Sequence, residues 1–209
     1  MARARTDERA TEFVGRRPIT ARRRELLAIA ARLFAERGYG GTTIDDLGSA
    51  AGISGPALYW HFPSKDALLA EMLTDISDRL LVGARECVAV AGTPVDAVRA
   101  LVEFQAAFAV ENPALITVHQ RELPHLTARD RQVVRRTQRR YLEVWVSALA
   151  EIAPTVDERD LRSATHGLFG LLNATPNIPG QDPDHLKELL GAIALGAIDA
   201  LTDGAISGA

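Results

Sequence analysis

The stretch from Thr42 to Lys65 constrains this chain more than any other, because its small, polar and proline residues divide it into two short helices and a tight turn. Thr42 or Thr43 can begin the first helix, since a threonine hydroxyl satisfies free amides of an opening turn. Gly52 suits the left-handed backbone that commonly ends a helix. Ser54 can cap the second helix as a threonine caps the first. The stretch therefore predicts a helix-turn-helix unit.

The second of these helices has an unusual surface for its length. Leu58 and Phe62 are four residues apart and should face inward, which leaves the residues between them exposed. A short helix with exposed aromatics and a following lysine, Lys65, suits the major groove of DNA, where Tyr59 and His61 can donate to phosphates. The alternative is a plain three-helix packing unit, because helix-turn-helix patterns recur by chance.

Charge is unevenly distributed along the chain. Residues 1–65 hold 11 Lys and Arg against 7 Asp and Glu, a net charge of +4, whereas the remaining residues hold 13 against 20, a net charge of -7. This segregation indicates a nucleic-acid-binding head on an acidic body. The arginines of residues 1–19 predict a flexible arm, which either follows DNA phosphates and enters the minor groove or is a solvated terminus.

Helical spacing of apolar residues continues on both sides of this stretch, and no strand pattern competes with it. One helix is predicted before it, from just after Thr20 to Gly38. Six more are predicted beyond it: 65–90, from Thr93-Pro94 through Phe108, 114–122, from Thr127 to Ala153, from a Thr155–Glu158 capping box to before Pro176, and from Asp182-Pro183 to about 203. The chain is therefore predicted to be an all-α protein of nine helices. Its expected parts are a flexible basic arm (1–19), a helix-turn-helix DNA-binding domain (20–64) and a ligand-binding and dimerisation domain (65–209).

Several classes of protein are disfavoured by what the chain lacks. It has no apolar run near the ~18 residues of a membrane span and no signal-peptide core at its arginine-rich start, so we expect a cytoplasmic protein without membrane contact. The single Cys87 excludes an internal disulfide framework. We find no glycine-rich phosphate loop, no metal-spaced His/Cys set and no nucleophile–base motif. We therefore expect no enzyme activity, no cofactor and no metal.

Residues 20–70 resemble the N-terminal DNA-binding domain of the TetR/AcrR family of bacterial repressors. The resemblance is carried by Leu33-Phe34, Gly38-Tyr39, Thr42-Thr43-Ile44, Ala51-Gly52-Ile53-Ser54, Leu58-Tyr59-Trp60-His61-Phe62 and Ser64-Lys65. It implies a TetR-like fold and DNA contacts from Thr43, Ser54, Gly55, Pro56, Ala57, Tyr59, Trp60, His61 and Lys65. Gly55 and Ala57 cannot make bidentate base contacts, so specificity should depend on thymine methyl groups, backbone amides, the arm or DNA shape.

The last two predicted helices are rich in apolar and small residues. Such a surface lets another helix approach closely, although ordinary interior packing is the alternative. By the resemblance, these helices of two subunits form a four-helix bundle. The residues expected in this homodimer contact are Leu168, Leu190, Ile193, Leu195 and Ala197.

The middle helices carry the candidate ligand site. Its expected residues are the aromatics Phe104, Phe108, Tyr141, Trp145 and Phe169, with polar anchors from Gln105, His119, Glu122, His166 and Asn173. Simple core is the more common role for each of these aromatics. The cluster of Arg135, Arg136, Arg139 and Arg140 is either a solvated face or an anchor for an anionic ligand, in which Arg139 and Arg140 are the expected contacts.

Three segments, 121–124, 135–145 and 167–173, resemble actinobacterial members of the family that sense acyl-CoA thioesters or other lipid catabolites. The expected function is a ligand-responsive dimeric repressor that binds a palindromic operator on double-stranded DNA. A small hydrophobic or anionic-lipid-like effector, such as an acyl-CoA, should release it. The alternatives are a repressor that senses cationic or aromatic drugs and controls an efflux pump, a helical interaction module without sequence preference, and an enzyme of small apolar substrates.

Overall fold

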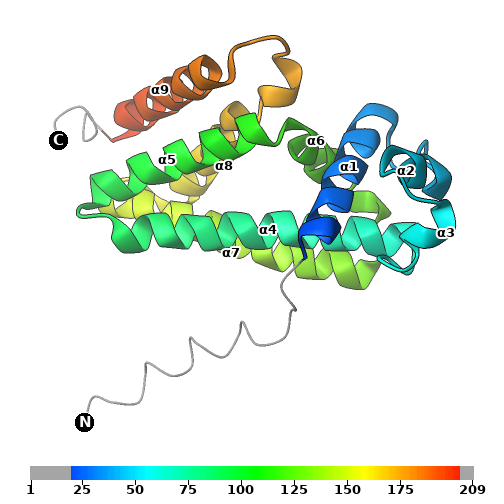
Figure 1. Cartoon of the computed structure of the whole chain (residues 1–209). Helices are drawn as coiled ribbons and strands as arrows, with labels where there is room; N and C mark the ends of the chain where they lie inside the picture. Colours follow the sequence, from blue (N-terminus) through cyan, green and yellow to red (C-terminus); the bar gives the residue numbers. More distant parts are fainter. Residues whose placement is uncertain (1–19, 203–209) are drawn as a thin grey trace.

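A computed structural model describes residues 20–202, which form nine α-helices and two short 3-10 helices with no strand among them (Figure 1). The prediction of an all-α protein with nine helices is therefore confirmed. The arginine-rich segment predicted as an arm lies outside the described residues.

Three helices build the N-terminal head: α1 (Ala21–Arg37), α2 (Ile44–Ala50) and α3 (Gly55–Leu58). Thr20 caps α1 by accepting a hydrogen bond from the Arg23 amide, and Gly38 ends it with a φ of 75°. The apolar stripe of α1 is buried against α2, α4 and α6, and Phe34, Leu58 and Phe62 are each at most 2% exposed. This core holds the two short helices, which are too short to be stable alone.

Helix α4 (Lys65–Val90) extends from the head through the body, and α7 (Ala128–Ile152) packs along it (Figure 1). Ser64 caps α4, and its apolar face is buried over several turns. The predicted bounds of α4 are confirmed. A single continuous helix thus contributes both to the head and to the interior of the body.

The other body elements pack around α4 and α7. They are α5 (Pro94–Glu111), α6 (Pro113–Arg121), η2 (Leu123–His125), α8 (Glu158–Leu172), η3 (Thr175–Asn177) and α9 (Pro183–Leu201). Helix α6 also contacts α1, so the body meets the head at a second place besides α4. No helix in the described part of the chain is long and apolar enough to cross a membrane.

The predicted capping box at the start of α8 is wrong. Asp157 is the N-cap, and its carboxylate accepts a 2.8 Å hydrogen bond from the Arg159 amide. Thr155 lies before this N-cap and cannot reach the first amides of the helix. The amide of Val156 closes a turn onto the Ala153 carbonyl at 3.1 Å. An aspartate at this position also interacts favourably with the positive end of the helix dipole.

Candidate nucleic-acid interface and effector cavity

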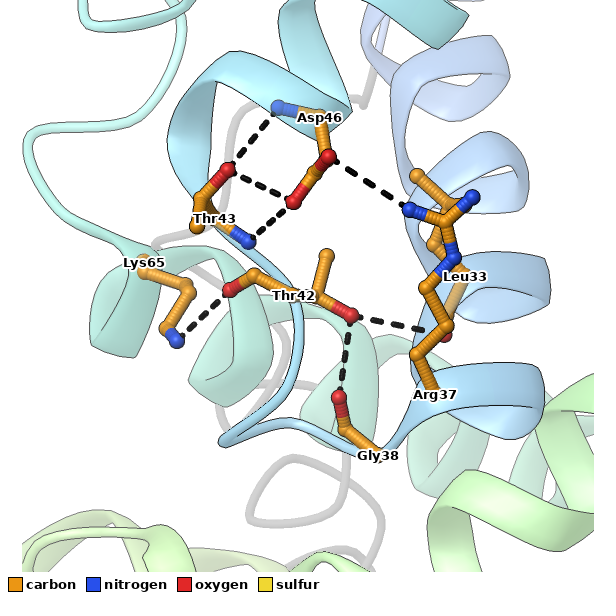
Figure 2. Close-up of polar contacts among 7 residues, drawn as sticks. All are labelled: Leu33, Arg37, Gly38, Thr42, Thr43, Asp46 and Lys65. Carbon is orange, nitrogen blue, oxygen red and sulfur yellow. Dashed lines mark hydrogen bonds and ion pairs between the residues drawn. The ribbon is translucent and has the colours of Figure 1, made fainter.

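The link between α1 and α2 is fixed by two adjacent threonines with different roles (Figure 2). Thr43 caps α2: its hydroxyl accepts from the Asp46 amide at 3.1 Å, and its own amide donates to the Asp46 carboxylate at 2.8 Å. The Thr43 hydroxyl also donates to the Asp46 carboxylate at 2.6 Å, and this hydrogen bond, followed by the one from the Thr43 amide and a smaller contribution from Arg37, lowers the pKa of Asp46. Thr42 is buried instead, and its hydroxyl donates to the Gly38 carbonyl at 2.9 Å. Of the two alternatives for the cap, the structure selects Thr43.

Two glycines set how closely α2 and α3 approach. Gly52 has a φ of 67°, in the left-handed region predicted for it. A Cβ atom on Gly48 would lie only 2.9 Å from the Gly55 nitrogen and 2.9 Å from the Ile53 carbonyl oxygen. Even an alanine at position 48 would therefore push α3 away, so this glycine permits the helix-turn-helix angle.

The residues expected to contact DNA do not all reach the surface. Trp60 and Tyr59 are 89% and 51% exposed, and Pro56, Ser54 and Thr43 are exposed as well. Ala57 and His61 are partly buried. Gly55 is buried against α2, where Asp45 and Ile44 occupy the space of any side chain. The structure thus corrects the expectation for Gly55, which offers no side chain and no exposed surface.

Arg23 of α1 connects the segment that follows α3 to α4, a role that the sequence did not predict. Its guanidinium forms a paired contact with the Glu71 carboxylate and donates to the His61 carbonyl. It also lies 4.2 Å from the centre of the Phe62 ring. These contacts join three elements at one side chain, so Arg23 positions the segment that carries Tyr59 rather than extending toward solvent.

Lys65 was expected to contact a phosphate, yet its ammonium is engaged within the head (Figure 2). It donates to the carbonyls of Tyr39 and Thr42, each at 2.9 Å, and lies 4.2 Å above the Tyr39 ring. The Tyr39 hydroxyl in turn donates to Asp66. Lys65 therefore fastens the start of α4 to the α1–α2 link, and its contact with DNA stays a prediction.

The body encloses a cavity of about 430 Å³ between α4, α5, α6, α7 and α8. Its walls are mostly apolar, and none of its lining residues is an aspartate or a glutamate. The lining residues are Ile76, Ser77, Leu80, Gln105, Ile116, His119, Gln120, Arg135, Gln138, Arg139, Tyr141, Leu142, His166, Phe169, Gly170 and Asn173. The volume lies within the usual range for small-molecule sites.

The structure brings half of the expected ligand residues to this cavity, together with two more of the candidate anchors. The lining includes His119, Arg139, Tyr141, Phe169 and Asn173, and also Gln105 and His166. It also includes Ile76, Ser77 and Leu80 of α4, which the sequence reading assigned to no site. Ser77 is a buried polar position on α4, but so is Thr74, which does not line the cavity, so polarity alone did not mark the site.

The other expected ligand residues lie elsewhere. Trp145 is fully buried behind the wall, edge-on to Phe169 with the ring centres 5.3 Å apart. Phe104 packs against Gly83, and Phe108 lies beneath the guanidinium of Arg79 at 5.2 Å. These three rings belong to the core.

Glu122 is also buried, and it accepts a 3.0 Å contact from His125 at the junction with the head. Arg140 is partly buried and does not line the cavity. The expectation is therefore corrected for five residues in all, the three rings of the core together with Glu122 and Arg140.

The polar groups inside the cavity are uncharged. The Tyr141 hydroxyl donates to Gln105, whose amide nitrogen donates to the Asn173 carbonyl oxygen at 2.7 Å. Burial raises the pKa of Tyr141 above its usual value and lowers the pKa of His119 below its usual value. His119 is therefore a neutral imidazole at pH 7, and its Nε2 accepts from the Gln138 amide nitrogen at 2.7 Å.

Positive charge is confined to the exposed edge of the cavity. Arg135 and Arg139, one helical turn apart on α7, line the cavity and are exposed; we call them the rim arginines. Arg136 and Arg140 do not line it. The predicted basic cluster is thus divided between two faces of α7, and only one of these faces the cavity.

The outer surface of α8 and α9 carries the expected dimer residues only in part. Ile193 is 47% exposed, and Ala197 is exposed one turn further along. Leu195 is partly buried against the core. Leu168 and Leu190 are 5% and 3% exposed in a single subunit, so they have little surface left for a partner. The structure corrects the expectation for these two and leaves a face formed largely by small residues, which also includes Leu189 at 46% exposure.

The chain is similar to known bacterial regulators over most of its length. It is 36% identical to the HTH-type transcriptional repressor KstR2 of Rhodococcus jostii over 131 residues, which are 62% of this chain and 64% of that relative. The chain thus spans slightly less than two thirds of the length of this relative.

Solved structures share the fold. The structure of ketosteroid transcriptional regulator KstR2 of Mycobacterium tuberculosis matches 86% of this chain and 95% of its own, with 27% identity and a TM-score of 0.69. A TetR-family transcriptional regulator from Bordetella parapertussis matches 83% of this chain and 93% of its own, with 27% identity and a TM-score of 0.74.

Two family models match separate parts of the chain. Residues 26–72 match the bacterial regulatory proteins of the tetR family, and residues 91–177 match the tetracyclin repressor-like C-terminal domain. Together the two matches cover more than half of the residues. The chain therefore belongs to the tetR family of bacterial regulatory proteins.

Proposed function

We propose that this protein is a dimeric transcriptional repressor that binds an operator through α3 and is released by an anionic, largely apolar effector in the body cavity. An acyl-CoA thioester is the effector class that we favour. The proposal joins three features of the chain: the exposed aromatic pair on the head, the apolar face of α8 and α9, and the cavity with its rim arginines.

The observation that carries the DNA-binding role is the exposure of Trp60 and Tyr59. Large aromatic side chains seldom stand this far out of a folded surface unless they meet a partner. The residues beneath them, Leu58 and Phe62, are buried, so the head holds the aromatic pair in a fixed position. That surface fits a DNA groove, with the Tyr59 hydroxyl donating to a phosphate.

Dimerisation is part of the proposal because one short helix contacts few base pairs. Two heads spaced by about one DNA turn, roughly 34–36 Å, can occupy successive major grooves of a palindromic site. The exposed Leu189, Ile193 and Ala197 on one face of α9 support pairing through this helix and α8. The substitution Ile193→Arg should yield monomers by light scattering, and an unchanged dimer mass would contradict this interface.

The effector class follows from the charges of the cavity lining. Two arginines and no carboxylate favour an anionic group at the edge, because guanidinium binds carboxylate and phosphate bidentately. The apolar walls favour a hydrocarbon body, and the name of the ketosteroid regulator KstR2 agrees with an apolar effector. The same lining argues against cationic drugs, which would meet the rim arginines without a compensating acid.

The DNA-binding role is tested by fluorescence anisotropy with operator fragments selected from genomic DNA and with random DNA across a range of salt. Operator affinity should exceed random affinity at every salt concentration. Tyr59→Phe should weaken operator binding about fivefold, the effect of roughly 1 kcal/mol. Equal affinity for both DNAs at all salts would favour a helical module without sequence preference.

A further inference from the structure

We propose that the buried end of the effector carries an uncharged carbonyl oxygen, which is held by Gln105, Tyr141 and Asn173. We call these three residues the polar trio. The inference rests on the proposed function and makes its effector more specific: a hydrocarbon body with an anionic group at the rim arginines and a neutral carbonyl at the other end.

The polar trio forms a hydrogen-bonded chain with a direction. The Tyr141 hydroxyl donates to Gln105 Oε1, and Gln105 Nε2 donates to Asn173 Oδ1. Each of the two amide oxygens therefore accepts one hydrogen bond. The hydrogens of Asn173 Nδ2 and the second hydrogen of Gln105 Nε2 have no acceptor among the described residues. These amide hydrogens are donors available to the cavity, and a carbonyl oxygen is an acceptor that can take them.

All three side chains line the cavity, and Gln105 and Tyr141 are only 1% and 6% exposed. Both polar atoms of Gln105 have partners within the trio, and one amide hydrogen of its side chain remains for a polar group in the cavity. Among the described residues the members of the trio hydrogen-bond to one another and to no arginine or lysine, so a carboxylate or phosphate held there would have no counter-charge. The partner is therefore a neutral acceptor.

The consequence is discrimination between two kinds of acyl chain. A saturated chain end would displace solvent from the trio without replacing its hydrogen bonds, whereas an oxo group would satisfy the free amide hydrogens. Sites built to hydrogen-bond an oxygen function reject analogues that lack it, because their own buried groups are left unpaired. The cavity should therefore prefer an oxo-acyl chain to a saturated chain of the same length.

The test compares matched pairs of CoA thioesters on the full-length protein by isothermal titration calorimetry: decanoyl-CoA against 9-oxodecanoyl-CoA, and octanoyl-CoA against 7-oxooctanoyl-CoA. We expect the oxo member of at least one pair to bind about tenfold more tightly. The triple variant Gln105→Met, Tyr141→Phe, Asn173→Leu replaces every polar group of the trio and should abolish this ratio while retaining the saturated ligand. Circular dichroism checks its fold, and Asn173→Leu alone, which should reduce the ratio, serves if the triple variant does not fold.

The matched control is Arg135→Gln with Arg139→Gln, which should weaken both members of a pair alike and leave their ratio unchanged. Equal binding of both members to the wild-type protein, with operator release by both, would overturn this inference and leave the proposed function intact. Tighter binding of the saturated member would overturn it as well. If no thioester bound or released the operator, the anionic effector itself would be refuted, and this inference with it.

Discussion

The head and the body of this protein use their polar residues in opposite ways. In the head, Thr43, Arg23 and Lys65 direct their hydrogen bonds to backbone and side chains of the same unit. In the body, Gln105 and His119 direct theirs around a cavity. The hydrogen bonds of the head thus fix the geometry of its helices, whereas those of the body lie around the cavity. The two regions should therefore respond differently to equivalent substitutions.

The largest difference is expected for aromatic truncation. Phe34→Ala removes a ring that is fully buried in the head core and should lower the free energy of unfolding by about 3–5 kcal/mol. Phe169→Ala removes a ring that already borders the cavity, so fewer contacts are lost and the cost should be smaller. Urea denaturation followed by circular dichroism measures both. Equal costs would mean that the cavity wall is packed as tightly as the head.

Removing the arginine of the partly buried Arg23–Glu71 ion pair should have the next largest effect. Arg23→Met leaves the partly buried Glu71 unpaired and the His61 carbonyl without its donor, at a cost of about 1–3 kcal/mol. Operator affinity should fall too, because the segment with Tyr59 loses its attachment to α4. Arg139→Met at the exposed cavity edge is the matched control and should change stability by less than about 0.5 kcal/mol. Unaltered DNA binding by the Arg23 variant would exclude its positioning role.

Two caps with the same chemistry allow a closer comparison. Thr43 caps α2 and Thr127 caps α7, and in each case the threonine hydroxyl accepts from the amide of the aspartate three residues later and donates to its carboxylate. Replacing either threonine with alanine should cost about 1 kcal/mol in thermal or urea unfolding. Only the Thr43 variant should also weaken operator binding, as measured by fluorescence anisotropy. A similar loss of DNA affinity from Thr127→Ala would show that the body controls the head even without effector.

The smallest effect is expected from pH and belongs to the body. Burial lowers the pKa of His119, so the unfolded chain binds its proton more readily than the folded chain. The free energy that neutral His119 contributes to folding is fully present above the ordinary histidine pKa, and it decreases as the pH falls below that value. Melting temperatures between pH 7.5 and 5.5 should fall less steeply for His119→Gln than for the wild type. Parallel curves would mean that His119 titrates normally.

Sequence motifs predicted the head almost completely, because its constraints are local. The caps at Ser54 and Ser64 and the left-handed Gly52 each depend on residues within a few positions. Arg23 was missed because its partners, His61 and Glu71, are far away in the sequence. Nothing in a single chain's sequence indicates which distant groups an arginine will meet.

The body was predicted as helices but not as a site. Helical spacing identifies an apolar face, yet it does not distinguish Phe104 and Trp145, which are core, from Phe169, which borders the cavity. That distinction depends on where five helices fail to close against one another. The Arg135–Arg140 cluster shows the same limit, because spacing alone could not tell which two of its members would face the opening.

Because α4 is a single continuous helix, a movement at its cavity end displaces its other end in the head. Ile76 and Leu80 border the cavity, whereas Lys65 at the other end of the helix is bonded to the link between α1 and α2. At a rise of 1.5 Å per residue, these points are roughly 17–22 Å apart, so a tilt of about 5° at the cavity moves Lys65 by roughly 2 Å. In the proposed dimer, a tilt of this size in each subunit would change the distance between the two heads.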